Sequence, residues 1–564
     1  MRRGPALFFI IVLLFASAYG AQRALLTGWN LLADYSPPYF RSARPDTGPT
    51  PLAHRLVLIA VDGLEPDDVT RLPSLDWIRR QGASYRLTVP LPAAPDAAAA
   101  TLLTGAPPDL HGYLFPAIHH TLQVDSLPEA AARVQRSFGG FGAGSLRSLT
   151  GGSWPVPAAS EDLVKAAQAF MAPTGPQLAV IQMQMPTPPA GAAENAPPDP
   201  ELSLAMLDSL LVQILDPLDL ETTAVMVVGL PDARDAAAPL KSSDVPLVMA
   251  GAGIRKGIWG NASLMDVAPT AAALLGVPTP VLCQGEPLLS ALTAEGRPAD
   301  VIIRQYLAAR RSFANSVLQA LFSTVELPEP PDSQAEADSY LQLVSSSLRD
   351  ARVGFWKALA PKRLPYLGGA LLVLLLYLAV VLTRRFGGPA FLSILTYLAG
   401  FHLLLLPTGG GYLGTVAGIT EITTISLLLQ GLKVALPMAL GCLVNGFLLS
   451  RQRVRRKNFV GAASLHTALA TAAVTAIPAI ILLAVAGWEF PAGLPAPGLV
   501  AWFLAAAFQV VVIGYLSPLW LVLTVSAARL SLRLWPLPEI GDPVRNADNI
   551  IRLKNVRRHA RTGR

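Results

Sequence analysis

Residues 56–63 read LVLIAVDG, and residues 101–112 read TLLTGAPPDLHG. The apolar run Leu56–Val61 is unbroken, as is typical of a central parallel strand that is buried on both faces of a sheet. The run ends at Asp62-Gly63, and parallel sheets form their sites at the carboxyl ends of their strands. We therefore expect Asp62 to lie at the site-bearing edge of a sheet.

Strands and helices alternate along the chain on the carboxyl side of this run. Three further apolar stretches have the length of buried strands: Gln177–Gln184, Thr223–Gly229 and Val245–Ala250. Helical periodicity occurs at about Asp67–Arg80, Glu161–Met171 and Glu201–Leu215. This alternation predicts an α/β fold, with a mostly parallel sheet sandwiched by helices.

Five short segments match one known family in order. They are VDGLEPD at 61–67, LPSL at 72–75 with Gly82, TLLTG at 101–105 with His111-Gly112, VPL at 245–247 with GAGI at 251–254, and DVAPT at 266–270 with LGVP at 275–278. Over residues 55–290 the chain resembles the alkaline-phosphatase superfamily, in its type I phosphodiesterase/nucleotide pyrophosphatase branch. The resemblance implies an alkaline-phosphatase-like fold for this part of the chain.

The resemblance also implies a chemistry. In this family two metal ions, usually zinc, bind a substrate phosphate, and a Thr or Ser between them attacks phosphorus. Asp62 matches the first metal-ligand aspartate. The nucleophile position, three residues after Pro92, holds Pro95, which has no hydroxyl group. A shift of one residue gives Asp96, which is a candidate ligand and not the family nucleophile, so we assign no catalytic residue.

The metal-binding histidines of the family have no counterpart here. The chain has seven histidines, at positions 54, 111, 119, 120, 402, 466 and 559, and none from Thr121 through Phe401. The family draws its three ligand histidines from that interval. Asp232 and Asp244 remain near the two later ligand positions, and together with His111, a framework residue in this family, they are our candidates for the cleft. We expect no cofactor, although an active site of this kind would need divalent metal ions.

The remainder of the chain has the composition of a membrane protein. The hydrophobic fraction is 52%, the charged fraction is 15% and the mean hydropathy is +0.44, with the excess at the N-terminus and after about Leu364. We predict an N-terminal anchor, with a cleaved signal peptide as the alternative because Ala16-Ser17-Ala18 resembles a cleavage site. Five later spans are predicted at Tyr366–Leu382, Pro389–Leu406, Thr423–Leu449, Ala462–Ala486 and Leu499–Val525.

Charge predicts the orientation of these spans. Every second connection is strongly basic, and the alternate ones are short and rich in Gly and Pro. The positive-inside rule then places both termini in the cytoplasm and residues 33–364 outside. The membrane would be a plasma or inner membrane. The net charge of +6 and the pI near 9.3 arise mostly from cytoplasmic segments that face anionic lipid, so we expect no nucleic-acid partner.

These patterns divide the chain into six parts. They are an anchor or signal segment (1–32), a linker (33–54), the outer domain (55–298), a helical hairpin or stalk (299–364), an all-α bundle of five transmembrane helices (365–528) and a basic cytoplasmic tail (529–564).

Three functions fit this organisation. The missing nucleophile and histidines favour a catalytically degenerate pseudoenzyme that serves binding or regulation at the membrane, with a lipid head group, a phosphoester ligand or a membrane protein as partner. The alternative is an active phosphodiesterase, nucleotide pyrophosphatase or phosphoethanolamine-type transferase, with Asp62, Asp96, Asp232 and Asp244 rebuilt around Mg²⁺ or Mn²⁺. In a third interpretation the spans handle a lipid or solute under control of the outer domain.

Overall fold

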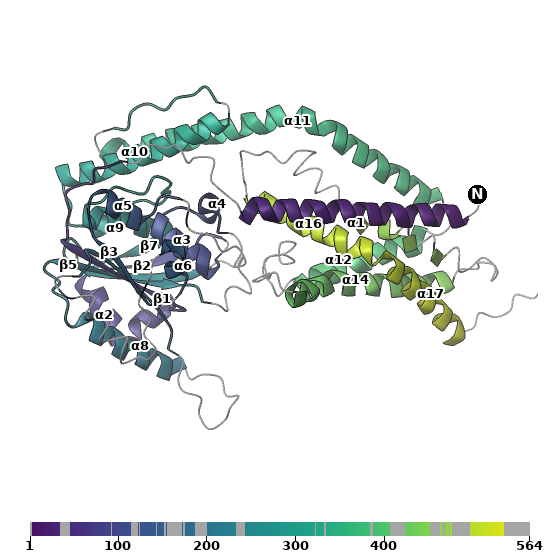
Figure 1. Cartoon of the computed structure of the whole chain (residues 1–564), viewed down its shortest axis with the longest axis horizontal. Helices are drawn as coiled ribbons and strands as arrows, with labels where there is room; N and C mark the ends of the chain where they lie inside the picture. The colour runs from purple at the N-terminus through teal and green to yellow at the C-terminus, as the bar shows by residue number, and fades with distance from the viewer. Residues whose placement is uncertain are drawn as a thin grey trace, which may run out of the picture.

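A computed structural model gives the structure of the chain. It describes residues 3–33, 45–91, 93–113, 122, 124–142, 144–151, 154, 168, 172, 175–186, 200–232, 243–321, 323–331, 334–383, 387–405, 424–451, 463–464, 467–468, 470–472, 474–475 and 497–534. An α/β domain lies at one end of the molecule and a group of long helices at the other (Figure 1).

A seven-stranded sheet forms the centre of the α/β domain, in the order β3-β4-β1-β5-β6-β2-β7. Its strands are β1 Arg55–Asp62, β2 Ala83–Thr88, β3 Phe138–Gly142, β4 Leu178–Gln184, β5 Thr223–Leu230, β6 Asp244–Gly251 and β7 Ile258–Ser263. Only β6 runs opposite to the others, because it pairs antiparallel with both β5 and β2. The carboxyl ends of β1, β4 and β5 therefore share one edge with the start of β6.

Helices cover both faces of the sheet because alternate side chains of β1 point to opposite sides. Leu56, Leu58 and Ala60 pack in the core beneath α3 (Pro95–Thr104), α5 (Leu127–Arg133), α6 (Ser145–Thr150) and α9 (Val267–Leu275). Val57, Ile59 and Val61 pack beneath α2 (Pro73–Gln81) and α8 (Pro200–Leu215). Figure 1 shows these two layers of helices on either side of the sheet. The predicted fold class, a mostly parallel sheet sandwiched by helices, is confirmed.

Two helices connect this domain to the rest of the molecule. α10 (Arg297–Ala320) packs on the domain through Phe313 and Val317, which share a buried cluster with Leu282. α11 (Ala337–Thr383) is 47 residues long and runs back along α10 before it continues to the far end of the molecule (Figure 1).

The remaining long helices pack together in a bundle. They are α1 (Arg3–Ala33), α12 (Gly387–Leu405), α14 (Thr424–Ser450), α16 (Pro497–Tyr515) and α17 (Ser517–Leu534). Among the described helices, two stretches are long and apolar enough to cross a membrane, Ile10–Gly28 in α1 and Gly431–Ser450 in α14. The predicted span Ala462–Ala486 falls largely outside the described residues.

The predicted span Leu499–Val525 covers two helices, α16 and α17, which meet at an angle of 56° and together are apolar enough for one bent span. Pro518 explains the break, since proline has no N–H for the carbonyl four residues earlier and its ring would clash with that carbonyl. The apolar pattern of the sequence continues across this position, so hydropathy alone predicts one helix.

The N-terminal helix is part of the bundle. α1 packs along α16, where a Cβ atom on Gly514 would come within 2.7 Å of the Ala18 Cβ. The rings of Phe15 and Tyr515 make an edge contact with centroids 5.8 Å apart, and the Tyr515 hydroxyl donates to Gln22 Oε1 at 2.6 Å. Small residues allow this close approach, as they do between membrane helices generally.

Candidate functional site

Asp62 lies at the carboxyl end of β1, at the edge of the sheet that the sequence indicates. Gly63 follows it in the left-handed region, with φ of 85°, and its N–H donates to Leu230 O at 2.7 Å. A Cβ atom at Gly63 would lie 3.3 Å from the Cβ of Asp232. Because Asp232 follows β5 directly and β5 pairs with β1, the sheet brings the two aspartates to the same place.

Gln182 holds the Asp62 carboxylate. This residue of β4 is 1% exposed, and its Nε2 donates to both carboxylate oxygens of Asp62, at 3.0 and 3.2 Å. Its Oε1 accepts a hydrogen bond from Leu146 N at 2.9 Å, which fixes the orientation of the amide. Gly144 leaves the necessary room, because a Cβ there would lie 2.3 Å from Gln182 Cδ.

Gln182 was not among the predicted site residues. The signal was present, since Gln182 is a polar residue in the middle of the strand LAVIQMQ, whose residues are otherwise buried up to Met183. A polar residue inside a fully buried strand needs a hydrogen-bond partner, and the strand-end aspartate of the neighbouring strand supplies it.

The Asp62 carboxyl titrates well above the usual range of an aspartate. Burial raises its pKa to about 6, the hydrogen bonds from Gln182 oppose the rise, and the charges of Asp232 and Asp96 add to it. Removal from water disfavours the charged form, and like charges nearby do the same. Two of the other predicted carboxylates, Asp96 and Asp232, therefore act on Asp62 at this edge.

The segment that holds the family's nucleophile is the start of α3. Pro95 is the first residue of this helix and Asp96 stands in its first turn, while Ala97–Thr104 are all buried. Proline suits the first helical turn, where the missing N–H has no partner within the helix. A carboxylate in the first turn is favoured by the helix dipole. The structure thus makes Pro95 and Asp96 the start of a regular helix.

Asp244 lies at the same edge of the sheet but has a different partner. It begins β6, its side chain is 38% exposed, and it stands 3.7 Å from Arg86 Nη1. Arg86 also bonds Asp67 Oδ1 at 3.2 Å. Asp244 is thereby turned toward the surface arginine rather than grouped with Asp62.

His111 is buried in the framework behind this edge. It closes the short helix α4 (Pro108–His111) and is 1% exposed. Its Nδ1 accepts from Tyr113 N at 3.2 Å, which leaves the Nε2 proton to donate to Thr101 Oγ1 at 3.1 Å. Both ring nitrogens are therefore engaged inside the protein.

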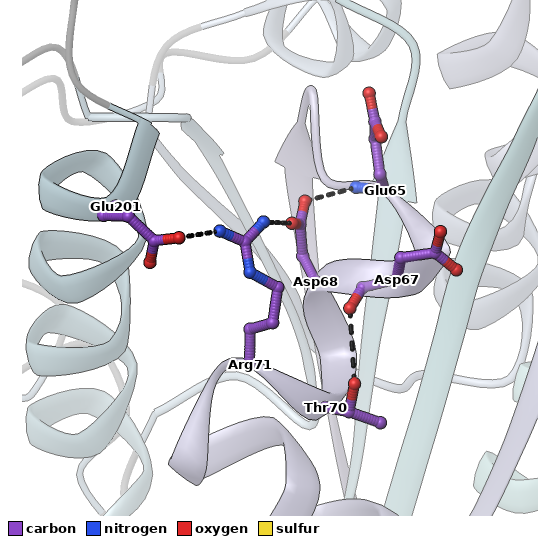
Figure 2. Close-up of polar contacts among 6 residues, drawn as sticks. All are labelled: Glu65, Asp67, Asp68, Thr70, Arg71 and Glu201. Atoms are coloured by element: carbon purple, nitrogen blue, oxygen red, sulfur yellow. Dashed lines mark hydrogen bonds and ion pairs between the residues drawn. The ribbon is translucent and has the colours of Figure 1, made fainter.

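An ion-pair chain fixes the loop that leaves the site (Figure 2). In the 3-10 turn η1 (Pro66–Thr70), Asp68 accepts from Glu65 N at 3.1 Å and from Arg71 Nη1 at 3.1 Å. The other terminal nitrogen of Arg71 pairs with Glu201 in the first turn of α8. This chain ties the loop after β1 to the helix that covers the same face of the sheet.

The donor set does not fit a two-zinc centre. Such a centre needs imidazole and carboxylate ligands in tetrahedral groups. Within the described ranges, no group of three or more His, Cys, Asp or Glu side chains is arranged to hold a metal ion. The residues around Asp62 supply carboxylates and one amide, so we derive no reaction step through a metal.

Comparisons with known proteins found similarity to solved structures alone. No family model matches the chain, and no curated protein sequence matches it either. Its structure is similar to a 2-O GAG sulfatase, with 15% identity over 43% of this chain and 75% of that one and a TM-score of 0.35. It is similar to murine ectonucleotide pyrophosphatase/phosphodiesterase 5, with 12% identity over 40% and 96% and a TM-score of 0.32.

A protein of the alkaline phosphatase superfamily from Vibrio parahaemolyticus is similar at 17% identity, over 49% of this chain and 79% of that one, with a TM-score of 0.35. Each of these three matches covers less than half of this chain, at a TM-score below 0.5.

Proposed function

We propose that this chain is a membrane-held protein whose outer α/β domain does not carry out metal-dependent phosphoryl transfer and instead serves binding or regulation at the membrane. A lipid head group, a phosphoester or another membrane protein would be its partner. The domain has the sheet edge at which the superfamily places its site. The residues at that edge contact other protein groups, Asp62 with Gln182 and Asp244 with Arg86.

The observation that carries the proposal is the pairing of Asp62 with Gln182 beside a helix that begins at Pro95. A neutral amide donates to both oxygens of the carboxylate, at 3.0 and 3.2 Å. Covalent catalysis of this kind needs an activated hydroxyl next to the metal-binding carboxylate. The hydroxyl of Thr101, further along α3, is fully buried and bonded to His111.

The membrane part of the proposal is supported by composition. Within the part of the chain that the structure describes, two helices are long and apolar enough to span a bilayer, and the bent pair α16–α17 is a third candidate. We propose the orientation that the basic loops indicate, with both termini in the cytoplasm and the α/β domain outside.

Metal analysis combined with an activity screen tests the proposal. The purified full chain in detergent should contain less than one equivalent of zinc, manganese or magnesium after dialysis. Phosphodiester, phosphomonoester and sulfate ester substrates should turn over no faster with the wild type than with Asp62→Ala. Asp67→Ala, an exposed neighbour whose side chain is 90% accessible, is the matched control. Bound metal together with turnover that only Asp62→Ala abolishes would show the proposal to be wrong.

One observation favours a second function. Asp96 and Asp232 both act electrostatically on Asp62. Among the described residues these carboxylates are not arranged to hold a metal ion, so a rebuilt site would have to draw them together around a hard cation such as Mg²⁺ or Mn²⁺. An active, rebuilt phosphodiesterase site would use that cation. A calorimetric titration with Mn²⁺ should then show saturable binding. Asp96→Asn and Asp232→Asn should each lower the affinity for Mn²⁺ at least tenfold, while Asp244→Asn should leave it unchanged. Binding that is absent or insensitive to these changes removes this alternative.

A further inference from the structure

The side-chain amide of Gln182 is fixed in one orientation. Its Nε2 donates to Asp62 Oδ1 at 3.0 Å and to Asp62 Oδ2 at 3.2 Å, and also to Ser145 Oγ at 3.4 Å. Its Oε1 accepts from Leu146 N at 2.9 Å. If the two ends of the amide were exchanged, an oxygen would face the carboxylate and an NH₂ group would face an N–H donor, so both contacts would become repulsive. Gln182 therefore presents a donor to Asp62, and its one side-chain oxygen points away from that carboxylate.

The backbone beside β4 is built closely around this amide. Gly142 of β3 lies opposite Gln182 in the parallel register, and Gly144 follows just before α6. A Cβ atom at Gly142 would clash with the backbone carbonyl of Gln182, and a Cβ atom at Gly144 would clash with its side-chain amide. The position of the amide is therefore set by its surroundings as well as by its hydrogen bonds.

The spacing between the amide and the carboxylate is that of two oxygen ligands on one cation. In an octahedral Mg²⁺ site with bonds of about 2.1 Å, neighbouring oxygen ligands are about 3.0 Å apart. Gln182 Nε2 lies 3.0 and 3.2 Å from the two oxygens of Asp62. An oxygen in place of this nitrogen would need a cation or a proton between itself and Asp62, whereas the nitrogen brings its own hydrogen atom.

The charges at this edge favour a cation, and Gln182 opposes their effect without adding a charge. Burial raises the pKa of Asp62 most, and the charges of Asp232 and Asp96 raise it further. The hydrogen bonds from Gln182 lower the same pKa, because they stabilise the ionised carboxylate. The amide thus supplies part of the stabilisation that a cation would otherwise give to these negative charges.

We propose that Gln182 is the residue that keeps this edge free of metal, because its amide nitrogen takes the position of a second oxygen ligand and donates a hydrogen bond to Asp62. The inference rests on the proposed function, in which the outer domain carries no catalytic metal. It goes further than that function, since it assigns the exclusion of a hard cation to one donor atom on β4. Missing histidines explain why zinc has no site here, but they do not bear on a cation that prefers oxygen ligands.

Exchange of this one nitrogen for oxygen tests the inference. Gln182→Glu, in the full chain in detergent at pH 8, should bind one Mn²⁺ per chain in a calorimetric titration, at least tenfold more tightly than the wild type. Gln182→Glu combined with Asp62→Asn should bind Mn²⁺ no better than the wild type, because only one of the two carboxylates is left. Gln177→Glu is the matched control. It adds the same charge next to the opposite end of β4, where the side-chain oxygen of Gln177 accepts from Ser137 N, and should behave like the wild type.

Thermal unfolding gives a second readout that does not depend on activity. Without metal at pH 8, Gln182→Glu places two carboxylates in contact inside the protein and should melt at a lower temperature than the wild type. Saturating Mn²⁺ should raise the melting temperature of this variant by at least five degrees, because a ligand that binds only the folded state stabilises it. The melting temperature of the wild type should change by less than one degree.

The results separate the inference from the proposed function. If neither the wild type nor Gln182→Glu binds Mn²⁺, or if Gln182→Glu stays unfolded with Mn²⁺ present, the inference is wrong and the proposed function is unaffected. Binding by Gln182→Glu that persists when Asp62→Asn is added would place the cation elsewhere and would also overturn the inference. Saturable binding of Mn²⁺ to the wild type that Asp62→Asn abolishes would instead refute the proposed function.

Discussion

Asp62 is a carboxylate whose charge the surrounding protein disfavours. Its pKa is raised from 3.8 to about 6, chiefly by burial. A raised carboxyl pKa means that the folded state binds a proton more tightly than the unfolded state does. The contribution of the protonated group to stability is therefore fully present below pH 3.8 and is lost as pH rises through about 6.

Asp62→Asn should remove this pH dependence. We expect the variant to be more stable than the wild type above pH 7, by about 1–3 kcal/mol, with the difference shrinking toward pH 4. Urea unfolding of the outer domain within the full chain, repeated between pH 4 and pH 8, measures it. Asp67→Asn, at an exposed site, should change the free energy of unfolding by less than about 0.5 kcal/mol. A variant less stable than the wild type at pH 8 would contradict the expectation.

At the scale of the element, one buried ion pair holds α5 in place. Arg133 bonds both oxygens of Asp125, at 2.5 and 2.9 Å, and the Asp125 side chain is 2% exposed. Asp125 also accepts from Val281 N at 3.0 Å. Arg133→Gln leaves a buried carboxylate without its cation and should cost about 3 kcal/mol in urea unfolding.

Two further variants control this prediction. Arg255→Gln breaks an exposed pair with Glu295 and should cost less than about 1 kcal/mol. The double variant Arg133→Gln with Asp125→Asn should recover part of the loss, since the uncompensated charge is then gone. A loss of similar size from Arg133→Gln and Arg255→Gln would show that burial of the pair is unimportant.

The contact between α1 and α16 leaves no room at Gly514. Gly514→Leu should push the helices apart and lower the free energy of unfolding by about 2 kcal/mol or more, seen as a lower melting temperature in detergent. Gly20→Leu is the matched control on α1, because nothing lies within 4 Å of a Cβ there. If both variants melt like the wild type, α1 does not pack against α16 in the protein.

Sequence periodicity predicts elements well where the burial is uniform. The run at β1 identifies its own strand and the carboxylate at its end, because both depend on local sequence. Two other features depend on which strands become neighbours: the reversed direction of β6 and the hydrogen bonds from Gln182 to Asp62. Gln182 and Asp62 are 120 residues apart in the sequence. The break before Pro518 was missed because hydropathy averages over a whole span and ignores the missing N–H.

For the whole molecule, the proposed orientation predicts which positions a reagent reaches. The two native cysteines are buried, so a maleimide should react with an introduced cysteine and not with them. A membrane-impermeant maleimide should label Ser339→Cys, on the exposed surface of α11, in intact cells. It should label Thr562→Cys in the basic tail only after permeabilisation. The opposite pattern would invert the topology, and labelling of both in intact cells would place the tail outside.

The continuous helix α11 fixes a height as well as a connection. At 1.5 Å per residue, 47 residues extend for about 70 Å, and a bilayer core takes up about 30 Å of that length. Under the proposed topology roughly 40 Å of helix remains outside, with Pro361 and Pro365 as bending points at its membrane end, whereas a flexible tether would let the domain move freely. α11 then sets the distance between the outer domain and the membrane, and the domain can contact partners that lie at that distance.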